Sequence, residues 1–555
     1  MITLRVVEDR IQVTSPFAFK SVLETLPGGR WSRTESAWTF PAAPIAAGNL
    51  RGALRGTDEK MMADKAFRAL LAESDLFADR QGLKALDDLP QPEVRKTDAW
   101  NHQRQAFHFA HDMPAVLLDM EMGTGKTKVV IDLIQNRGHE RILIACPNTV
   151  VRVWPREFEK HGAIKVKIVA PQTGGIARRV AETKLAFEQA RIEGVPAVVV
   201  VNHEAFWQGD FGKWLPTAGL DLVVYDEIHR LKSPGGKQSR FAQKLSRKVP
   251  YRLGLTGTPM PHSPLDVYGE MRALDESVFG TSFVRFRNRY AVMGGWEGRE
   301  VVGYRNEPEL REKIGAVTYS VGADVLDLPE AHHIDRFCVL TPSAWKAYSS
   351  LETEFYTDVK DGTVTVSNAL VKLLRMQQVT SGHVGLDESD GAGKRKVTRI
   401  DDSKEKLLAD VLEDLKPDEP VVIFCRFTDD LQRVHEVAKK LGRGSAELSG
   451  GRKELDAWER EDGPPILAVQ MQSGGVGIDL TRASYCIYYS VGFSLGEYQQ
   501  SLARVHRPGQ DRPVTYIHLL AEGTIDVKVK NALAERADVV KSVMYGDSER
   551  VSIGT

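Results

Sequence analysis

Short apolar runs separated by helical stretches recur in two series along this chain of 555 residues. The first series, between residues 115 and 257, reads AVLL, RILIAC, AVVVV, DLVVYDE and YRLGLTG; the second, after residue 420, reads VVIFC, PILAV, SYCIYY and VTYIHLL. Apolar runs without polar alternation are typical of strands buried on both faces of a parallel sheet. Their alternation with helices predicts a doubly wound α/β fold. We therefore expect two domains of this class.

The regions around these two series differ in pattern. Residues 1–56 are β-like, with MITLRVV and RIQVTS as candidate strands, and form a small α+β module. The predicted organisation is a module at 1–56, a helical linker at 57–95, a first α/β domain at 96–262, a largely helical insertion at 263–400, a second α/β domain at 401–540 and a tail at 541–555. Within the insertion, residues 387–396 read as a mobile loop.

Composition excludes several classes of protein. The 74 basic and 75 acidic residues nearly cancel, so any binding of nucleic acid must come from local patches. No apolar run reaches the length of a membrane span and the charged start is not signal-like, so we expect no membrane partner. Four scattered cysteines have no metal-ligand spacing, which predicts no metal cluster and a reducing, cytoplasmic setting.

The stretch GTGKT has the composition of a loop that holds phosphates. It follows the apolar run AVLLDM and precedes the helical run TKVVIDLI, as a phosphate loop should. The glycines let backbone N–H groups turn toward phosphate, Lys126 would reach the β and γ phosphates, and Thr127 would help to hold Mg²⁺. A Gly-rich turn with a solvated lysine is the competing interpretation. The predicted ATP contacts here are Met122, Gly123, Thr124, Gly125, Lys126 and Thr127.

A pair of carboxylates ends another apolar run. Asp226 and Glu227 follow DLVVY about a hundred residues after the phosphate loop. An aspartate at a strand end can bind Mg²⁺, and the adjacent glutamate can polarise an attacking water. An isolated Asp-Glu pair means little in a charged chain, but its place after a phosphate loop favours a nucleoside triphosphatase. Asp226 and Glu227 are therefore candidate catalytic residues, with Asp226 also a candidate Mg²⁺ ligand.

The order of motifs from about residue 97 to 530 resembles the Swi/Snf-related ATPases, which belong to the superfamily 2 helicases and translocases. DMEMGTGKT is similar to the family's DEMGLGKT, and DEIH to its DEAH box. Gln103 in WNHQRQAF resembles the glutamine that reads adenine. The segment IACPNTVVRVWPREFEKH has the family's Cys-Pro and following Trp. LTGTP resembles the motif that couples ATP state to DNA grip, which implies a nucleic-acid contact for Thr256.

The second half of the chain matches the same family. SGGVGIDLTRAS, residues 473–484, resembles its Gly-rich segment, which implies a nucleic-acid contact for Ser473 and an ATP contact for Gly477. QSLARVHRPGQ, residues 500–510, resembles the signature QAxxRxHRxGQ. The resemblance implies catalytic roles for Gln500, Arg504 and Arg507, with both arginines facing the phosphates. GTID at 523–526 and LDLPE at 326–330 also fall where the family has similar residues.

Three departures from the family pattern stand out. Met120 occupies the slot where the family has Asp, VGFSLG replaces its Trp-Asn-Pro at 491–496, and YSVGAD at 319–324 lacks a basic cluster. These departures bear on regulation and on DNA contact. They leave the residues expected to hydrolyse ATP in place.

The resemblance implies two RecA-like lobes that use ATP and Mg²⁺ to drive movement on double-stranded or forked DNA, with annealing or fork remodelling as one outcome. Because such a motor works on any sequence, its contacts should be to phosphates. Strand separation on DNA or RNA, a catalytically silent scaffold, and the motor subunit of a restriction or defence complex are the alternatives. The compact layout favours a bacterial or viral protein acting in the host cytoplasm, with phage or bacterial replication and repair proteins as further partners.

A basic run lies between the DEIH and LTGTP motifs. It holds eight Lys or Arg from residue 230 to 252 and no Asp or Glu. Lys232, Lys237 and Arg240 are the candidate phosphate contacts, against the alternative of a solvated helix face.

LPGGRWSRTESAWTFP, residues 26–41, resembles the HARP module found beside motors of annealing helicases. The resemblance implies a DNA-binding role for residues 1–56, with Trp31 as a candidate for stacking on unpaired bases. Trp38 and Phe40 are expected in the core of the module.

Overall fold

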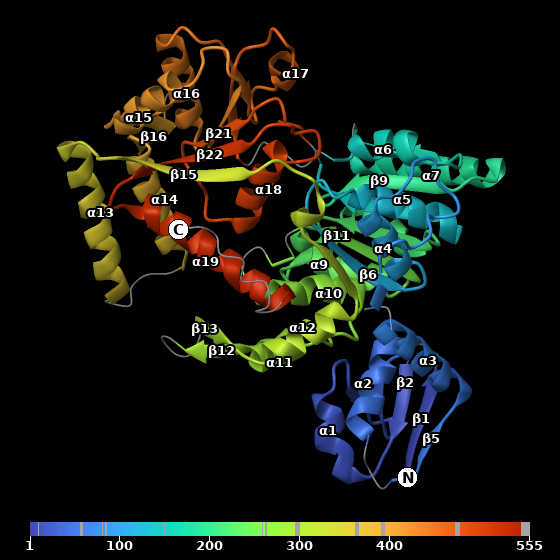
Figure 1. The fold of residues 1–555 in the computed structure, drawn as a ribbon. Coiled ribbons are helices and arrows are strands. Elements are labelled where there is room, and N and C mark those ends of the chain that lie inside the picture. The colour runs from blue at the N-terminus through green and yellow to red at the C-terminus, as the bar shows by residue number, and fades with distance from the viewer. Residues whose placement is uncertain are drawn as a thin grey trace. The chain divides into compact units, whose positions relative to one another are not determined.

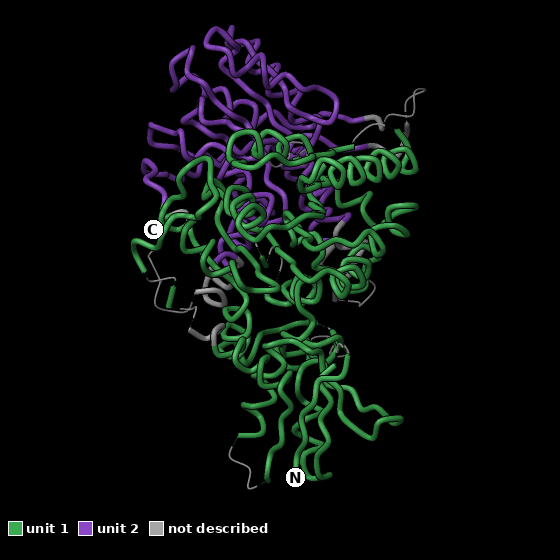
Figure 2. The backbone as a smooth tube through the Cα atoms, turned by 90° about the vertical axis from the view of Figure 1, so that its right-hand side faces the viewer, with its two compact units in different colours: residues 1–325, 539–555 green, residues 326–538 purple. Residues whose placement is uncertain are grey.

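The computed structural model describes residues 1–545, except for residue 9 and 56–58, 80–81, 84–85, 149, 172–173, 258, 261–262, 295–299, 361–365, 390–394 and 472–477. The chain divides into two compact units, which Figure 2 distinguishes by colour: residues 1–325 with 539–555, and residues 326–538. Among the described residues, no helix combines the length and the apolar character that crossing a membrane requires.

The N-terminal module is a small sheet with helices packed on it (Figure 1). Its described strands, in spatial order, are β3 (Arg30–Ser32), β4 (Ala37–Pro41), β2 (Arg10–Thr14), β1 (Ile2–Val7) and β5 (Met61–Ala63). Its helices are α1 (Lys20–Thr25), α2 (Pro44–Leu54) and α3 (Lys65–Asp79). Trp38 and Phe40 lie in its core with Ile2 and Leu50, which confirms the expectation for both aromatic residues. The strand β5 pairs with β1 from within the segment read as a linker.

Unit 1 continues into a parallel sheet with helices on it. Within the described residues its strands, in spatial order, are β14 (Thr318–Val321), β6 (Ala115–Met120), β11 (Tyr251–Thr256), β10 (Leu222–Asp226), β7 (Arg141–Cys146), β9 (Ala197–Asn202) and β8 (Lys167–Val169). The helices are α4 (Asn101–Ala110), α5 (Lys126–Arg137), α6 (Val153–His161), α7 (Ile176–Glu193), α8 (Gly209–Trp214), α9 (Lys237–Ser246) and α10 (Val267–Leu274). Every residue of β6 and β10 is buried, as the uninterrupted apolar runs predict.

Unit 2 contains a second parallel sheet. Its described strands, in spatial order, are β15 (Ala331–Cys338), β22 (Val514–Ala521), β21 (Tyr485–Tyr488), β18 (Val421–Cys425), β20 (Ile466–Gln470) and β19 (Ser445–Leu448). Its helices are α13 (Pro342–Lys360), α14 (Val366–Thr380), α15 (Ser403–Glu413), α16 (Thr428–Lys440), α17 (Leu455–Trp458), α18 (Leu495–Val505) and α19 (Ile525–Tyr545). Val421 and Ile423 pack into one core cluster, whereas Val422 and Phe424 pack into another. Both faces of the sheet are therefore covered, and the predicted pair of doubly wound domains is confirmed.

The region read as a largely helical insertion also contains strands. It holds α11 (Phe283–Tyr290) and α12 (Glu307–Gly315), the hairpin β12 (Ala291–Gly294) with β13 (Glu300–Tyr304), and the hairpin β16 (His383–Ser389) with β17 (Arg395–Arg399). Part of the stretch read as a mobile loop at 387–396 is therefore strand, and residues 390–394 lie outside the described residues. β14 and β15 are edge strands of mixed polarity, such as AHHIDRFC, so they lack the apolar signature of the central strands.

Candidate functional site

Three motifs of unit 1 meet at one edge of its sheet. The phosphate loop follows β6, the DEIH box ends β10, and LTGTP ends β11, which pairs with both β6 and β10. The register aligns Asp226 with Leu255 and Thr256 with Asp119. Because the strands are parallel, all three motifs lie at their carboxyl ends, where open α/β sheets bind ligands.

The phosphate loop adopts a conformation that its glycines make possible. Gly123 and Gly125 have φ of 84° and 83°, in the left-handed region. A Cβ on Gly125 would lie 2.2 Å from Nε2 of Gln103, so the loop has no space for a side chain there. Gly125 precedes α5 without any side-chain cap, which leaves the first N–H groups of that helix available to an anion. Lys126 Nζ donates to the carbonyls of Met120 at 2.5 Å and Glu121 at 3.2 Å.

The two carboxylates of the DEIH box are both buried. Burial, followed by the charge of Glu227, raises the pKa of Asp226 to about 7. Burial also acts to raise the pKa of Glu227, but the His229 ring and Lys126 outweigh it and hold that pKa below its usual value. Glu227 has φ of 54°, an unusual backbone conformation for a residue other than glycine and one that concentrates at functional sites.

Neighbouring side chains orient this pair. Trp154 Nε1 donates to Asp226 Oδ2 at 3.1 Å, and His203 Nε2 lies 2.6 Å from the Asp226 carbonyl oxygen. His229 Nδ1 lies 3.2 Å from Glu227 Oε2. The Trp154 and His203 contacts join residues far apart in sequence, and the resemblance places a Trp in this segment without giving its role.

The donors at this sheet edge fit a nucleotide with Mg²⁺. A buried pair of carboxylates beside Lys126 and an uncapped helix start offers oxygen ligands to a cation and N–H groups to phosphate. Thr127 is half-buried at the start of α5. The described residues contain no group of three or more His, Cys, Asp or Glu placed to hold a metal ion. A Mg²⁺ ion here would therefore take further ligands from phosphate and water, as Mg²⁺ commonly does.

Gln103 lies against the phosphate loop. Its Nε2 donates to the Thr124 carbonyl at 2.9 Å, and its Oε1 accepts from the backbone N–H of Trp100 at 3.0 Å. His102 Nε2 lies 2.8 Å from the same Thr124 carbonyl, and burial lowers the pKa of His102. A neutral ring that donates from Nε2 fits this acceptor. Gln103 therefore joins the start of α4 to the phosphate loop, and its predicted contact with adenine stays a prediction.

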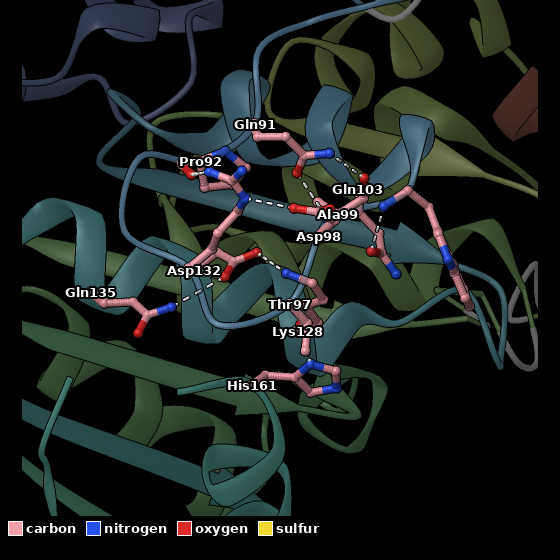
Figure 3. Close-up of polar contacts among 12 residues, drawn as sticks. Gln91, Pro92, Thr97, Asp98, Ala99, Gln103, Lys128, Asp132, Gln135 and His161 are labelled. Carbon is pink, nitrogen blue, oxygen red and sulfur yellow. Dashed lines mark hydrogen bonds and ion pairs between the residues drawn. The ribbon is translucent and has the colours of Figure 1, made fainter. Parts of the chain in front are cut away.

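The segment before α4, residues 91–100, is fastened at several points (Figure 3). Gln91 exchanges two hydrogen bonds with the backbone of Ala99, at 3.0 and 2.8 Å. Thr97 Oγ1 lies 2.7 Å from His161 Nδ1 on α6. Asn136 of α5 pairs with the N–H and the carbonyl of Val94, both at 2.8 Å. We call residues 91–100 the strap; it fixes the backbone from which Trp100 and α4 begin.

Within unit 2, the last motif lies on and after α18. Arg504 is 5% exposed, and its Nε and Nη1 have no hydrogen-bond partner. Burial lowers the pKa of Arg504 to about 10. Arg507 is half-buried and donates from Nη1 to the Ile478 carbonyl at 3.2 Å, and Gln500 is half-buried on α18. Ser473 and Gly477 lie outside the described residues.

Three tyrosine hydroxyls hold α18 on its sheet, a feature that motif reading does not predict. Tyr498 of α18 lies 2.8 Å from His518 Nε2 on β22. Tyr488 of β21 lies 2.7 Å from the Ser501 hydroxyl, and Tyr516 of β22 donates to the Leu502 carbonyl at 2.7 Å. The helix that carries Arg504 is thus positioned along its length.

The structure divides the basic run into two groups. Arg230 and Arg247 form ion pairs with Glu204 and Glu276, and Arg252 donates to the carbonyls of Leu274, Val249 and Pro250. Lys237, Arg240 and Lys244 are exposed on α9, at a spacing that places them on one helix face. Lys232 is half-buried.

Two further nucleic-acid candidates differ in accessibility. Thr256 is fully buried, with its hydroxyl 3.3 Å from His229 Nδ1. Its side chain therefore links LTGTP to the DEIH box, and its contact with nucleic acid stays a prediction. Trp31 is 52% exposed on β3 and packs edge-on against Trp38, with ring centroids 5.9 Å apart.

The fold and the site define a P-loop ATPase with two RecA-like lobes. The family model of the SNF2-related domain matches residues 99–383, and that of the helicase conserved C-terminal domain matches residues 403–509. The first match alone covers more than half of the chain, and the chain belongs to the SNF2-related family. It is accordingly an ATP-hydrolysing enzyme, and its predicted use of ATP is confirmed at the level of the family.

Several proteins are similar to this chain. Protein p41 of Acyrthosiphon pisum secondary endosymbiont phage 1 is 26% identical, over 73% of this chain and 89% of that protein. An ATP-dependent helicase of Mycoplasma pneumoniae is 22% identical, over 83% and 43%, and the DNA repair and recombination protein RDH54 of Saccharomyces cerevisiae is 24% identical, over 79% and 50%. This chain thus spans about half or less of the latter two. The SWI2/SNF2 ATPase core of Sulfolobus solfataricus in complex with dsDNA is 20% identical over 82% of this chain and 95% of its own, with a TM-score of 0.39.

Proposed function

We propose that this chain hydrolyses ATP with Mg²⁺ and uses the reaction to move along double-stranded or forked DNA without reading its sequence. The observation that carries the proposal is the buried Asp226–Glu227 pair at the same sheet edge as the phosphate loop, within the field of Lys126. Such a constellation suits phosphoryl transfer to water.

Each residue of the site has a chemical role in this reaction. The N–H groups at the start of α5 and the Lys126 ammonium bind and orient the phosphates. Thr127 and Asp226 would hold Mg²⁺, which would neutralise charge on the phosphates. Glu227 orients the attacking water and accepts its proton, and His229 holds the Glu227 carboxylate in place.

Arg504 and Arg507 stabilise the charge that spreads over the transferred phosphoryl oxygens. A guanidinium that is 5% exposed and lacks partners for Nε and Nη1 is costly to bury without an anion, which supports an anionic ligand for Arg504. Arginines in this role contribute about 10³–10⁵ in rate. Gln500 lies one turn before Arg504 on α18 and completes the proposed set.

DNA is the proposed track. Lys237, Arg240 and Lys244 form an exposed basic stripe on α9, suited to phosphate contacts that ignore base sequence. The relative RDH54 is named as a DNA repair and recombination protein, and the Sulfolobus solfataricus core was solved with dsDNA. Trp31 on the N-terminal module is the proposed stacking contact for an unpaired base at a fork.

A panel of nucleic acids tests the proposal. ATP turnover is measured with single-stranded, double-stranded and forked DNA and with RNA, for the wild type and for Lys126→Ala. We expect stimulation by double-stranded or forked DNA that Lys126→Ala abolishes. Stimulation by single strands alone, together with strand separation, would favour a helicase in the strict sense. Absence of any Lys126-dependent turnover would show a silent scaffold.

The N-terminal module has its own test. Removing residues 1–90 deletes the module and keeps the strap intact, so basal ATP hydrolysis should persist while affinity for forked DNA falls. Unchanged fork affinity in the truncated protein would remove the module from the proposal and leave the motor unaffected.

A further inference from the structure

The hairpin of β12 and β13 exposes apolar side chains on both of its faces. It forms a two-stranded sheet of its own, separate from the seven-stranded sheet of unit 1 (Figure 1). Val301 and Val302 of β13 are 40% and 59% exposed, and Val292 of β12 is 40% exposed. Because successive side chains of a strand point to opposite faces, valines lie on both faces of the hairpin. Gly294 leaves room for Val302, since a Cβ on it would lie 2.9 Å from the Val302 methyl carbons.

The base of this hairpin is fastened to the rest of unit 1. Tyr290 is buried, and its hydroxyl donates to Glu309 Oε1 of α12 at 3.0 Å. Its carbonyl accepts from the backbone N–H of Arg305 at 3.0 Å, which closes the hairpin at its base. The Tyr290 ring packs against Phe286 with centroids 5.0 Å apart, and Phe286 packs against Tyr268 of α10 at the same distance. An isolated two-stranded hairpin is marginally stable in water, so this base is what holds the valines as a fixed surface.

Arginines flank the hairpin. The helix α11, which leads into β12, reads FVRFRNRY and contains three arginines and no acidic residue. Arg285 on α11 and Arg305 after β13 are exposed, and Arg287 is half-buried. Within the part of the chain that the structure describes, no carboxylate pairs with any of these three, whereas Arg289 pairs with Glu309. An apolar ribbon beside arginines that keep their charge is complementary to nucleic acid, which presents apolar base faces beside phosphates.

The other end of α11 contacts the N-terminal module. Arg30 of β3 donates to Thr281 Oγ1 at 2.9 Å, and Arg285 Nη1 donates to the Glu24 carbonyl at 3.3 Å. Arg30 directly precedes Trp31, the proposed contact for an unpaired base. The module and the hairpin therefore lie at the two ends of one eight-residue helix, which is about 12 Å long.

The last base pair at a DNA fork matches this surface. In a continuous duplex both faces of each base pair are stacked, whereas the pair at a junction has one open face. Every base has such a π-face, so a contact with it ignores sequence. Apolar side chains pack between bases in this way in proteins that bend DNA. A partner protein is the alternative occupant, but arginines that no carboxylate neutralises favour a polyanion.

We propose that the β12–β13 hairpin packs its valines against the open face of the last base pair at a DNA fork, while the arginines beside it contact the phosphates. The inference rests on the proposed movement along DNA and names the feature of the DNA that is recognised, a junction. The apolar contact exists only at a junction, so it should add affinity for forked DNA alone. The arginine contacts should add affinity for duplex and fork alike.

Equilibrium binding of a continuous duplex, a fork and a single strand by the full-length protein, over a range of salt concentrations, tests the inference. The triple variant carries Thr at Val292, Val301 and Val302, which keeps the shape and the strand preference of each side chain and replaces a methyl by a hydroxyl. The Kd of the fork should rise about tenfold at every salt concentration, because the lost contact is apolar, and the Kd of the duplex and of the single strand should not change.

Arg305→Ala should act differently. It removes a phosphate contact, so it should weaken binding of duplex and fork equally and reduce the magnitude of the slope of log K against log salt by about 0.9. The matched control for the valine variant is the double variant Leu185→Thr with Ile192→Thr, at two exposed apolar residues of α7. It should bind all three DNA ligands like the wild type.

Thermal unfolding of the triple variant should resemble that of the wild type, because the three positions are exposed. If the triple variant is less stable, Val302→Thr alone should still give part of the loss of fork affinity. An unchanged fork Kd in both valine variants overturns the inference and leaves the hairpin to a partner protein. An equal loss for duplex and fork also overturns it, because the contact would not be at a junction. If the wild type shows no ATP turnover stimulated by any DNA, the proposed function itself fails, a result seen in the wild type and not in the valine variants.

Discussion

At the residue scale, environment separates side chains of the same type into different roles. Asp226 and Glu227 are neighbours in sequence, yet burial and the adjacent charge raise the pKa of Asp226 while His229 and Lys126 lower that of Glu227. An ionised Glu227 is the form that can accept a proton from water. At Met120 the identity of the side chain matters less. The side chain is buried and Lys126 contacts only the backbone carbonyl, so a Met where the family has Asp leaves the lysine contact intact.

Glu227→Gln should bind ATP but hardly turn it over. The amide preserves the size of the side chain and removes the proton acceptor, so kcat should fall by about 10²–10⁴-fold with the Kd of ATP little changed. Glu204→Gln, on an exposed residue paired with Arg230, serves as the control. Near-normal turnover in Glu227→Gln would place the general base elsewhere.

Two buried arginines of unit 2 should respond oppositely to truncation. Arg433 donates to Asp429, to Glu405 and to the carbonyls of Asp401 and Gly382, so Arg433→Ala should cost about 3–5 kcal/mol of stability. Arg504 lacks such carboxylate partners, so Arg504→Ala should leave the midpoint of thermal unfolding unchanged or slightly higher. Its kcat should nevertheless fall by about 10³-fold or more.

Thermal unfolding and single-turnover hydrolysis check both substitutions. A large loss of stability in Arg504→Ala would mean that the guanidinium serves the fold, and normal hydrolysis would remove it from the catalytic set.

At the element scale, helix faces decide which charges are available. The basic run from residue 230 to 252 reads as one patch in the sequence, but ion pairs and carbonyl contacts occupy several of its members. The stripe on α9 remains exposed because Lys237, Arg240 and Lys244 recur at intervals of three and four residues, opposite the buried Ala242 and Leu245.

Replacing all three stripe residues by Ala should weaken DNA binding and reduce its dependence on salt. The slope of log K against log salt is negative, and each lost phosphate contact reduces its magnitude by about 0.9, so loss of all three would reduce it by about 2.7. A control triple variant carries Ala at Lys165, Arg178 and Lys213, which pair with carboxylates. Equal slopes for both triple variants would show that α9 does not contact the DNA backbone.

At the scale of the whole molecule, each unit buries both faces of a parallel sheet and carries ionisable groups in its interior. In unit 1, His139 is 3% exposed, its Nε2 has no hydrogen-bond partner, and its ring packs edge-on against Tyr251. Burial, and then the charge of Arg137, lowers the pKa of His139 to about 4. The folded unit therefore resists protonation that the unfolded chain accepts near pH 6.5.

Because the folded pKa lies below the unfolded value, the contribution of neutral His139 to stability is complete above pH 6.5 and is lost as pH falls toward 4. His139→Phe should remove this part of the acid sensitivity. The difference in free energy of unfolding between variant and wild type should shift in favour of the variant by about 3 kcal/mol between pH 7 and pH 4. Urea unfolding at a series of pH values measures this shift. Curves for His139→Phe that run parallel to those of the wild type would contradict the prediction.

The central strands and the phosphate-binding motifs were predictable because their signals are local. Nine apolar runs became central strands of the two sheets, since burial on both faces demands uninterrupted apolar sequence. The edge strands β14 and β15 were not predicted, because their mixed polarity gives no uninterrupted apolar run. The roles of individual residues within the nucleotide site remain predictions that the variants above test.

The class of fold and the identity of the chemical groups follow from the amino-acid sequence, because strand periodicity and motif spacing act over a few residues. Which of these groups are held by a partner, and by which one, depends on tertiary contacts. Gln103 meets Thr124, Trp154 meets Asp226, and Tyr498 meets His518 through contacts that span 20 to 72 residues. Such contacts depend on how the strands and helices pack, and packing is also what leaves the Trp100 indole exposed on a fixed backbone.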